Sequence, residues 1–201
     1  MGSAHDDGSA GLRSRLGDRV RAWCEGRWWQ WRALVLLLVT WNGLWQLEDP
    51  AERGLFGGIT FGAHEFGHLI FAAFGEGMAI AGGSLMQLLV PIGAMALLLK
   101  QGDYFGVSVG GAWLASSLTD LAVYIGDARA HDLDLVGFGE DAVHDWAWLL
   151  GRAGALQHDL RLAGLARGLG ALLLAASFLA GAWLCLRMAA GARNSATADP
   201  S

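Results

Sequence analysis

Residues 58–75 read GITFGAHEFGHLIFAAFG, an apolar stretch interrupted only by His64, Glu65 and His68. Its length is close to the roughly 20 residues that a helix needs to cross a bilayer. Ionisable side chains inside such a segment are expensive to insert and are therefore expected to have a function. The stretch predicts a transmembrane helix that carries a chemical site.

The composition of the whole chain also indicates a membrane protein. Of its 201 residues, 54% are apolar and 16% are charged, and the mean hydropathy is +0.37. A soluble fold of this composition would lack the polar surface needed to cover its core. The net charge of −5 argues against nucleic acid as a partner. Cys24 and Cys185 lie far apart without a CxxC pattern, so we expect two unpaired thiols.

The apolar runs predict an all-α fold, a polytopic membrane helix bundle of about five transmembrane helices. Residues 1–32 are expected to form a cytoplasmic tail and a basic amphipathic helix, 33–187 a single membrane domain, and 188–201 a polar tail. The five predicted spans lie at about 33–47, 58–75, 84–99, 104–126 and 163–186.

The N-terminal segment alternates apolar residues with arginines. Leu12, Leu16, Val20 and Trp23 recur at near-helical spacing, which favours a basic helix lying on an anionic membrane face. The alternative is a solvated basic linker.

The distribution of basic residues predicts how the spans are oriented. With the N-terminus in the cytoplasm, ten of the fourteen lysines and arginines fall on the cytoplasmic side and four on the far side. We therefore expect the N-terminus and residues 127–161 in the cytoplasm and the C-terminus outside. Between the second and third spans, Gly82 and Gly83 are expected to form a turn, and Gln87 to face the bundle interior.

The residues His64-Glu65-Phe66-Gly67-His68 match the HExxH motif. On a helix, positions i and i+4 lie on one face, so both imidazoles can bind the same Zn²⁺ ion. Glu65 would then act as the general base toward a metal-bound water. A cluster of polar side chains that packs helices together without metal is the alternative.

A catalytic zinc needs a third protein ligand and an open position for water. Asp120 and Asp127 lie seven residues apart on one face of the fourth predicted span, and depth in the membrane favours Asp120. The uncertain helix boundary leaves Asp127 open, and its alternative role is an interfacial acid paired with Arg129. The polar segment that follows offers further candidates, namely His131, His144, Asp145 and His158.

The sequence His144-Asp145-Trp146 predicts a short amphipathic helix over the cytoplasmic mouth of the site. His144 would then be an extra ligand or a group that orients a ligand. An interfacial helix anchored by tryptophan is the alternative.

With HEFGH inside an apolar helix, the chain resembles the site-2 protease group of intramembrane zinc metalloproteases over roughly residues 58–130. The resemblance implies that Asp127 is the third zinc ligand and that Asp120 stands where the family has an asparagine. The chain is also similar to a set of small bacterial membrane proteins with HExxH, a YIxDAR stretch and a His-Asp-Trp. That similarity implies a bacterial inner membrane as the location.

The resulting hypothesis is an intramembrane zinc metallopeptidase that hydrolyses peptide bonds of membrane-embedded protein substrates. Its zinc ligands would be His64, His68 and Asp127, with Asp120 and His144 as alternatives, and Glu65 would be catalytic. Its surroundings would be the lipid bilayer. Two other functions stay open: a metal-binding membrane subunit or chaperone without turnover, and a zinc hydrolase acting on a lipid or a small amide.

Overall fold

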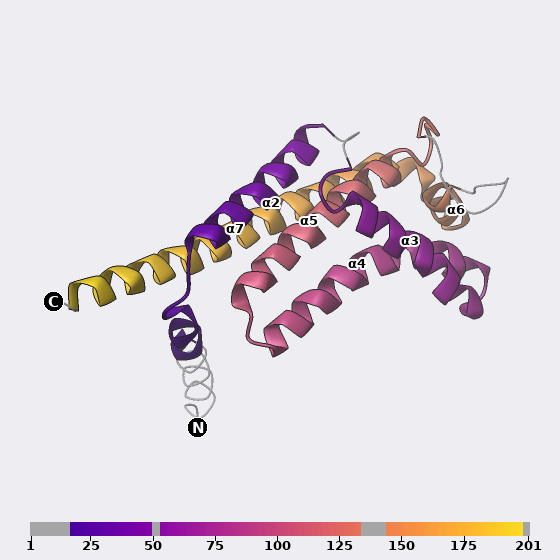
Figure 1. Cartoon of the computed structure of the whole chain (residues 1–201). Helices are drawn as coiled ribbons and strands as arrows, with labels where there is room; N and C mark the ends of the chain where they lie inside the picture. The colour runs from indigo at the N-terminus through magenta and orange to yellow at the C-terminus, as the bar shows by residue number, and fades with distance from the viewer. Residues whose placement is uncertain (1–16, 50–52, 134–143, 199–201) are drawn as a thin grey trace, which may run out of the picture.

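The structure, a computed structural model, describes residues 17–49, 53–133 and 144–198, with side chains up to residue 193. All regular secondary structure in these ranges is helical, which confirms the predicted all-α class. The helices pack into one elongated bundle (Figure 1). Residues 17–24 form a short N-terminal helix. The others are α2 (Gln30–Glu48), α3 (Gly57–Phe71), α4 (Glu76–Lys100), α5 (Tyr104–Gly126), α6 (Asp145–Arg152) and α7 (Asp159–Ala198), with 3₁₀ turns η1 (Ala72–Phe74) and η2 (Leu156–His158).

Small residues let the helices approach closely. Where α5 crosses α7, a Cβ on Gly111 would collide with the Ser177 hydroxyl. Where α3 crosses α4, a Cβ on Gly82 would lie 2.6 Å from the Gly67 carbonyl oxygen. Such small-residue contacts are the usual means by which helices associate in membranes.

The prediction of a turn at Gly82 and Gly83 was wrong, because both residues lie inside α4, which begins at Glu76. The glycines serve helix packing. Gln87, one turn further along α4, is only 2% exposed and faces the bundle interior as expected.

The direction of α2 differs from the predicted topology. Gly43 and Leu36 of α2 contact Leu174 and Gly181 of α7, so these two helices are antiparallel. Helix α5 is also antiparallel to α7, and it therefore runs in the same direction as α2.

Helix α3 continues in the direction of α2. The side chain of Gln46, near the end of α2, hydrogen-bonds to Ser116 of α5, and Thr60, near the start of α3, lies 3.5 Å from the neighbouring Ser117. Together α2 and α3 make one discontinuous passage along the bundle. The topology rule assumes that each apolar run reverses the chain, and this pair does not.

As a result, both ends of the described chain lie at the same end of the bundle, with α6 at the other (Figure 1). Cys24 of the N-terminal helix, Phe105 at the start of α5 and Met188 of α7 share one buried cluster. The prediction that the N-terminus shares a side with residues 127–161, and that the C-terminus lies opposite, is therefore not supported.

The exterior of the bundle is apolar and much of its interior is polar. Buried polar side chains include Gln46, Gln87, Ser116 and Ser117. Large apolar residues that are at least half exposed lie outside, among them Leu37 and Trp41 of α2, Leu97 and Leu99 of α4, and Leu165, Leu172 and Leu179 of α7. So many exposed large apolar side chains, together with buried polar ones, are unusual for a soluble helical protein.

Among the described helices, two are long and apolar enough to cross a membrane: Glu76–Lys100, which is α4, and the stretch Leu156–Arg193, which is mostly α7. Helix α3 has 15 residues, which gives a length of about 22 Å at 1.5 Å per residue, less than the roughly 30 Å hydrocarbon core. Helices lie over all five predicted spans, but length and composition alone support membrane crossing only for these two.

Candidate metal centre

Helix α3 presents two imidazoles on one face, as the HExxH spacing predicts. The ring centroids of His64 and His68 are 4.8 Å apart. Helix α4 comes close to them at Gly83, where a Cβ would lie 2.6 Å from Nε2 of each histidine. The absence of a side chain at Gly83 therefore leaves the space between the two Nε2 atoms open.

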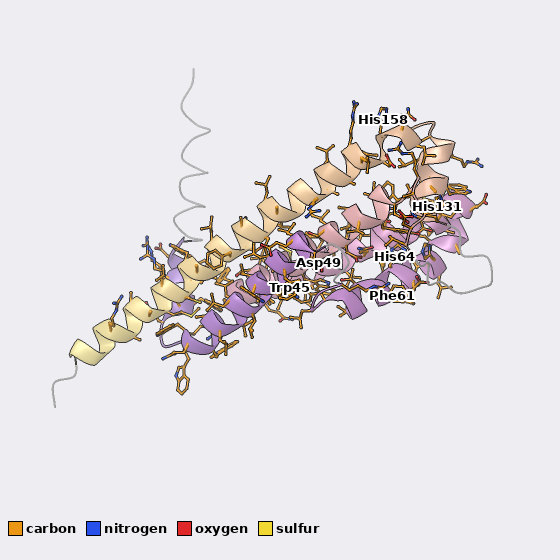
Figure 2. The ribbon with its side chains drawn as sticks, turned by 90° about the horizontal axis from the view of Figure 1, so that it is seen from above. Trp45, Asp49, Phe61, His64, His131 and His158 are labelled. Carbon is orange, nitrogen blue, oxygen red and sulfur yellow. The ribbon has the colours of Figure 1, made fainter. Side chains whose placement is uncertain are left out.

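The third member of the group is Asp145, the first residue of α6. Its Oδ2 atom lies 3.1 Å from Nε2 of His64 and 3.3 Å from Nε2 of His68. One ligand atom from each of the three residues lies within 4.8 Å of the others, so the group can hold a metal ion. Figure 2 shows His64 inside the bundle, whereas His131 and His158 lie toward the end where α7 begins.

The partners of His64 determine which ring nitrogen carries the proton. The amide nitrogen of Gln87 donates to the Ser117 carbonyl oxygen at 3.0 Å and to Oδ2 of Asp120 at 2.9 Å. Its amide oxygen therefore faces Nδ1 of His64, 3.0 Å away, and can only accept. His64 thus donates through Nδ1, and its Nε2 faces Asp145.

His68 is held in the same way. Its Nδ1 donates to the Ala79 carbonyl oxygen at 2.8 Å, and its Nε2 faces Asp145. A ring N–H that donates to a carbonyl or amide oxygen is the usual outer contact of a metal-binding histidine. With both Nδ1 atoms donating, the two Nε2 atoms and the Asp145 carboxylate need a positive charge between them, which a metal ion or a proton on Nε2 supplies.

The two separations of Asp145 from the imidazoles are compatible with a metal such as zinc. Zinc–nitrogen and zinc–oxygen bonds of about 2.0–2.2 Å in a tetrahedron place neighbouring ligand atoms about 3.3–3.6 Å apart. Oδ2 of Asp145 is 3.1 Å and 3.3 Å from the two nitrogens, close to that separation. Burial raises the pKa of the Asp145 carboxyl, but its contacts with the two imidazoles outweigh burial and hold the pKa below the usual range. The carboxyl is therefore an anion at neutral pH, as a metal ligand must be.

Hydrogen bonds to α4 and α5 hold helix α6 over the site. The backbone N–H of Asp145 donates to the Tyr124 hydroxyl at 3.0 Å, and the Trp146 indole donates to the Ser84 hydroxyl at 3.1 Å. His144 caps the helix, because its Nδ1 accepts from the Ala147 backbone N–H at 3.3 Å. The short helix predicted at His144-Asp145-Trp146 therefore exists and covers the site.

Asp127 does not reach the imidazoles of α3, so the structure does not place it as the third ligand. One carboxylate oxygen accepts from the backbone N–H of Asp132, and the other accepts from the N–H of Leu133 and from Nε2 of His144, at 3.2 Å. Because Asp127 ends α5, its carboxylate holds the chain that leaves α5 and the residue that starts α6. Arg129, which the sequence suggested as a partner of Asp127, forms an ion pair with Asp159 instead, at 2.6 Å.

His144 orients a ligand and is not itself a member of the group. Burial lowers the pKa of His144 more than the neighbouring Asp127 carboxylate raises it, so its ring is neutral near pH 7. Since its Nδ1 accepts from Ala147, its Nε2 carries the proton and donates to Asp127. This arrangement fixes the start of α6 and thereby the position of the adjacent Asp145.

Asp120 contacts the group only indirectly, through Gln87. Its carboxylate accepts from the Gln87 amide, whose oxygen in turn accepts from His64. The structure therefore makes Asp120 part of the support for His64. Both acids that the sequence favoured as third ligands contact the site through another residue.

Glu65 is half-buried and forms no hydrogen bond or ion pair within the described ranges. It acts electrostatically on both His68 and Tyr124, which places its carboxylate near the metal group. Of the three side chains in the group, that of His68 is the most exposed, at 28%, compared with 12% for His64 and 7% for Asp145. Access from outside is therefore on the His68 side.

Comparison of the chain with protein-family models, curated proteins and solved structures finds no match. The similarity to site-2 proteases rests on the motif residues themselves.

Proposed function

We propose that this chain is an integral membrane zinc hydrolase, and that its reaction is the hydrolysis of peptide bonds in membrane-embedded substrates. The observation that carries the proposal is the convergence of Nε2 of His64, Nε2 of His68 and Oδ2 of Asp145. Two histidines and one carboxylate are a ligand set of zinc hydrolases, in which the fourth position stays open for water or substrate.

The chemistry follows from the residues around that open position. A zinc ion bound there would polarise a carbonyl and lower the pKa of a bound water to near neutrality. Glu65, directly after His64 in the chain, would be the base that accepts a proton from the attacking water and returns it to the leaving amine. The Tyr124 hydroxyl, which accepts from the Asp145 N–H, keeps its own proton free to donate to a developing oxyanion.

The apolar exterior supports a location inside the bilayer. Exposed leucines and tryptophans cover α2, α4 and α7, while hydrogen-bonding side chains point inward. We infer four passages through the membrane: α2 with α3 as one discontinuous passage, then α4, α5 and α7. Discontinuous membrane helices occur where their polar backbone is covered by protein or lines a cavity.

The substitution Glu65→Gln tests the reaction. It removes the base but no metal ligand, so purified protein should hold about one zinc per chain while cleavage stops. Glu25→Gln, an exposed glutamate at the opposite end of the bundle, is the matched control. Cells that carry each variant are compared by quantitative proteomics and lipid analysis of their membranes.

Accumulation of an uncleaved membrane protein in the Glu65→Gln strain alone is the expected result. Accumulation of a lipid or amide instead would identify the hydrolase acting on small substrates. Unchanged membranes together with full zinc occupancy would contradict turnover and leave a metal-binding subunit. Wild-type protein without zinc would refute the centre itself.

A further inference from the structure

Three arginines gather at the end of the bundle opposite the metal centre. The guanidinium carbon of Arg27 lies 4.4 Å from the centre of the Trp23 ring, and that of Arg32 lies 5.7 Å from the same ring. The two guanidinium groups are therefore at most about 10 Å apart. Arg187 of α7 lies over Trp183, with 5.4 Å between its guanidinium carbon and the ring centre.

Met188, the neighbour of Arg187 on α7, shares a buried cluster with Cys24 of the N-terminal helix, which brings the third arginine to the other two. Burial raises the pKa of the Cys24 thiol, and the positive charges of Arg187, Arg27 and Arg32 oppose that rise. All three guanidinium groups thus act on one buried thiol, although they come from three different segments of the chain.

None of the three arginines forms an ion pair within the part of the chain that the structure describes. Arg27 and Arg32 each donate at 2.6 Å to a backbone carbonyl, that of Trp23 and of Trp28 respectively. Asp103 is the acidic residue with an electrostatic effect on Arg32, and its carboxylate caps α5 by accepting from the Gly106 N–H. Three like charges therefore lie together without a bonded counterion.

Arg32 has a buried hydrogen-bond donor without an acceptor. Its side chain is buried, with 9% exposure, and its Nε is the one buried side-chain nitrogen or oxygen among the described residues that has no hydrogen-bond partner. A buried donor without an acceptor costs about 1–3 kcal/mol, and more when the group is charged. An anionic ligand with several acceptor oxygens would remove this cost.

We propose that Arg27, Arg32 and Arg187 bind the phosphate group of an anionic phospholipid. Guanidinium groups donate two parallel hydrogen bonds to phosphate, and basic clusters between membrane helices recognise anionic headgroups. Exposed apolar side chains beside the cluster provide the surface for the acyl chains: Trp28 at 76%, Trp31 at 50%, Leu34 at 59% and Leu186 at 70%. A soluble phosphate would not need that apolar surface.

This lipid site is separate from the metal centre, so it is tested without any assay of turnover. Full-length protein in a neutral detergent is titrated with phosphatidylglycerol, with zwitterionic phosphatidylcholine, or with sodium phosphate. Native mass spectrometry counts the bound lipid, and thermal unfolding reports stabilisation. Four proteins are compared: wild type, the double variant Arg27→Gln with Arg187→Gln, the single variant Arg32→Lys, and Arg152→Gln with Arg161→Gln as a matched charge control at the far end.

We expect one tightly bound phosphatidylglycerol in the wild type and in the control, and about 30-fold weaker binding in the Arg27/Arg187 double variant. Arg32→Lys, which keeps the charge but loses the planar fork, should also weaken binding. Equal binding of both lipids by the wild type, or unchanged affinity in the Arg27/Arg187 variant, would overturn the site. Equal stabilisation by millimolar sodium phosphate alone would overturn the lipid as its ligand.

Discussion

Replacing Asp145 by asparagine is the sharpest test of the metal centre. The change is nearly isosteric, and the amide can still accept one hydrogen bond, but it removes the negative charge that faces the two imidazoles. Because Asp145 Oδ2 is within 3.3 Å of both Nε2 atoms, the substitution should act directly on metal affinity. Cap and packing contacts of α6 involve His144 and Trp146 and remain.

The expected size of the effect follows from typical zinc sites. Complete four-ligand sites bind zinc with about 10–16 kcal/mol, so one ligand accounts for about 2.5–4 kcal/mol. Asp145→Asn should therefore weaken zinc binding about 10²–10³-fold. Asp127→Asn, which disturbs the hydrogen bonds to His144 and to the chain leaving α5 but no member of the group, should weaken it about 10–100-fold.

The assay measures zinc in protein purified without chelators, and then the dissociation constant by competition with chelators of known affinity. Unfolding temperatures of the metal-free proteins show whether either variant is merely unfolded. If Asp145→Asn kept wild-type affinity while Asp127→Asn lost zinc entirely, the assignment of Asp145 would be wrong, and Asp127 would be the ligand that the motif resemblance implies.

Three further predictions address the space around the metal, the topology and the contact at the start of α7. Gly83→Ala would put a methyl group 2.6 Å from Nε2 of His64 and of His68, and should abolish zinc binding. Gly93→Ala, with nothing within 4 Å of its new Cβ, is the control and should leave zinc content unchanged. Equal zinc in both variants would contradict the close approach of α4. Reporter fusions at the two termini should report the same side, the cytoplasm, because seven of the twelve lysines and arginines in the described ranges lie at that end. A fusion at position 74 should report the opposite side, and termini on different sides would refute the single passage of α2 and α3. The hydrogen bond from Arg129 holds the pKa of Asp159 below its usual range. This contact therefore stabilises the fold fully at a pH above the pKa that Asp159 has in the unfolded chain, and the stabilisation is lost as the pH falls through the pKa of Asp159 in the folded protein. Between about pH 6 and pH 3 the unfolding temperature of the wild type should therefore drop more than that of Asp159→Asn, and parallel curves would show that the pair contributes nothing.

Local patterns in the sequence predicted what depends on local geometry. The i, i+4 spacing placed His64 and His68 on one face of a helix, and apolar runs predicted helices over all five ranges. The capped helix after His144 was also visible, because a polar stretch with tryptophan has a recognisable pattern.

Contacts between distant segments were not predictable from such patterns. Asp145 lies 77 residues after His68, and nothing periodic connects them. Asp127 attracted attention because it ends an apolar run, but a carboxylate at a helix end can equally accept backbone N–H groups, as it does here. The direction of α2 depends on whether a short linker reverses the chain, and hydropathy does not contain that information.

The division of the ligands between α3 and α6 has a consequence for how the protein is made. When His64 and His68 emerge from the ribosome, Asp145 has not yet been synthesised, and at about 5–20 residues per second it follows several seconds later. On the proposed function, the two imidazoles would enter the bilayer during that interval without the carboxylate that neutralises a bound cation. Metal loading would then be a late event of biogenesis, after the insertion of α4 and α5 and the arrival of α6.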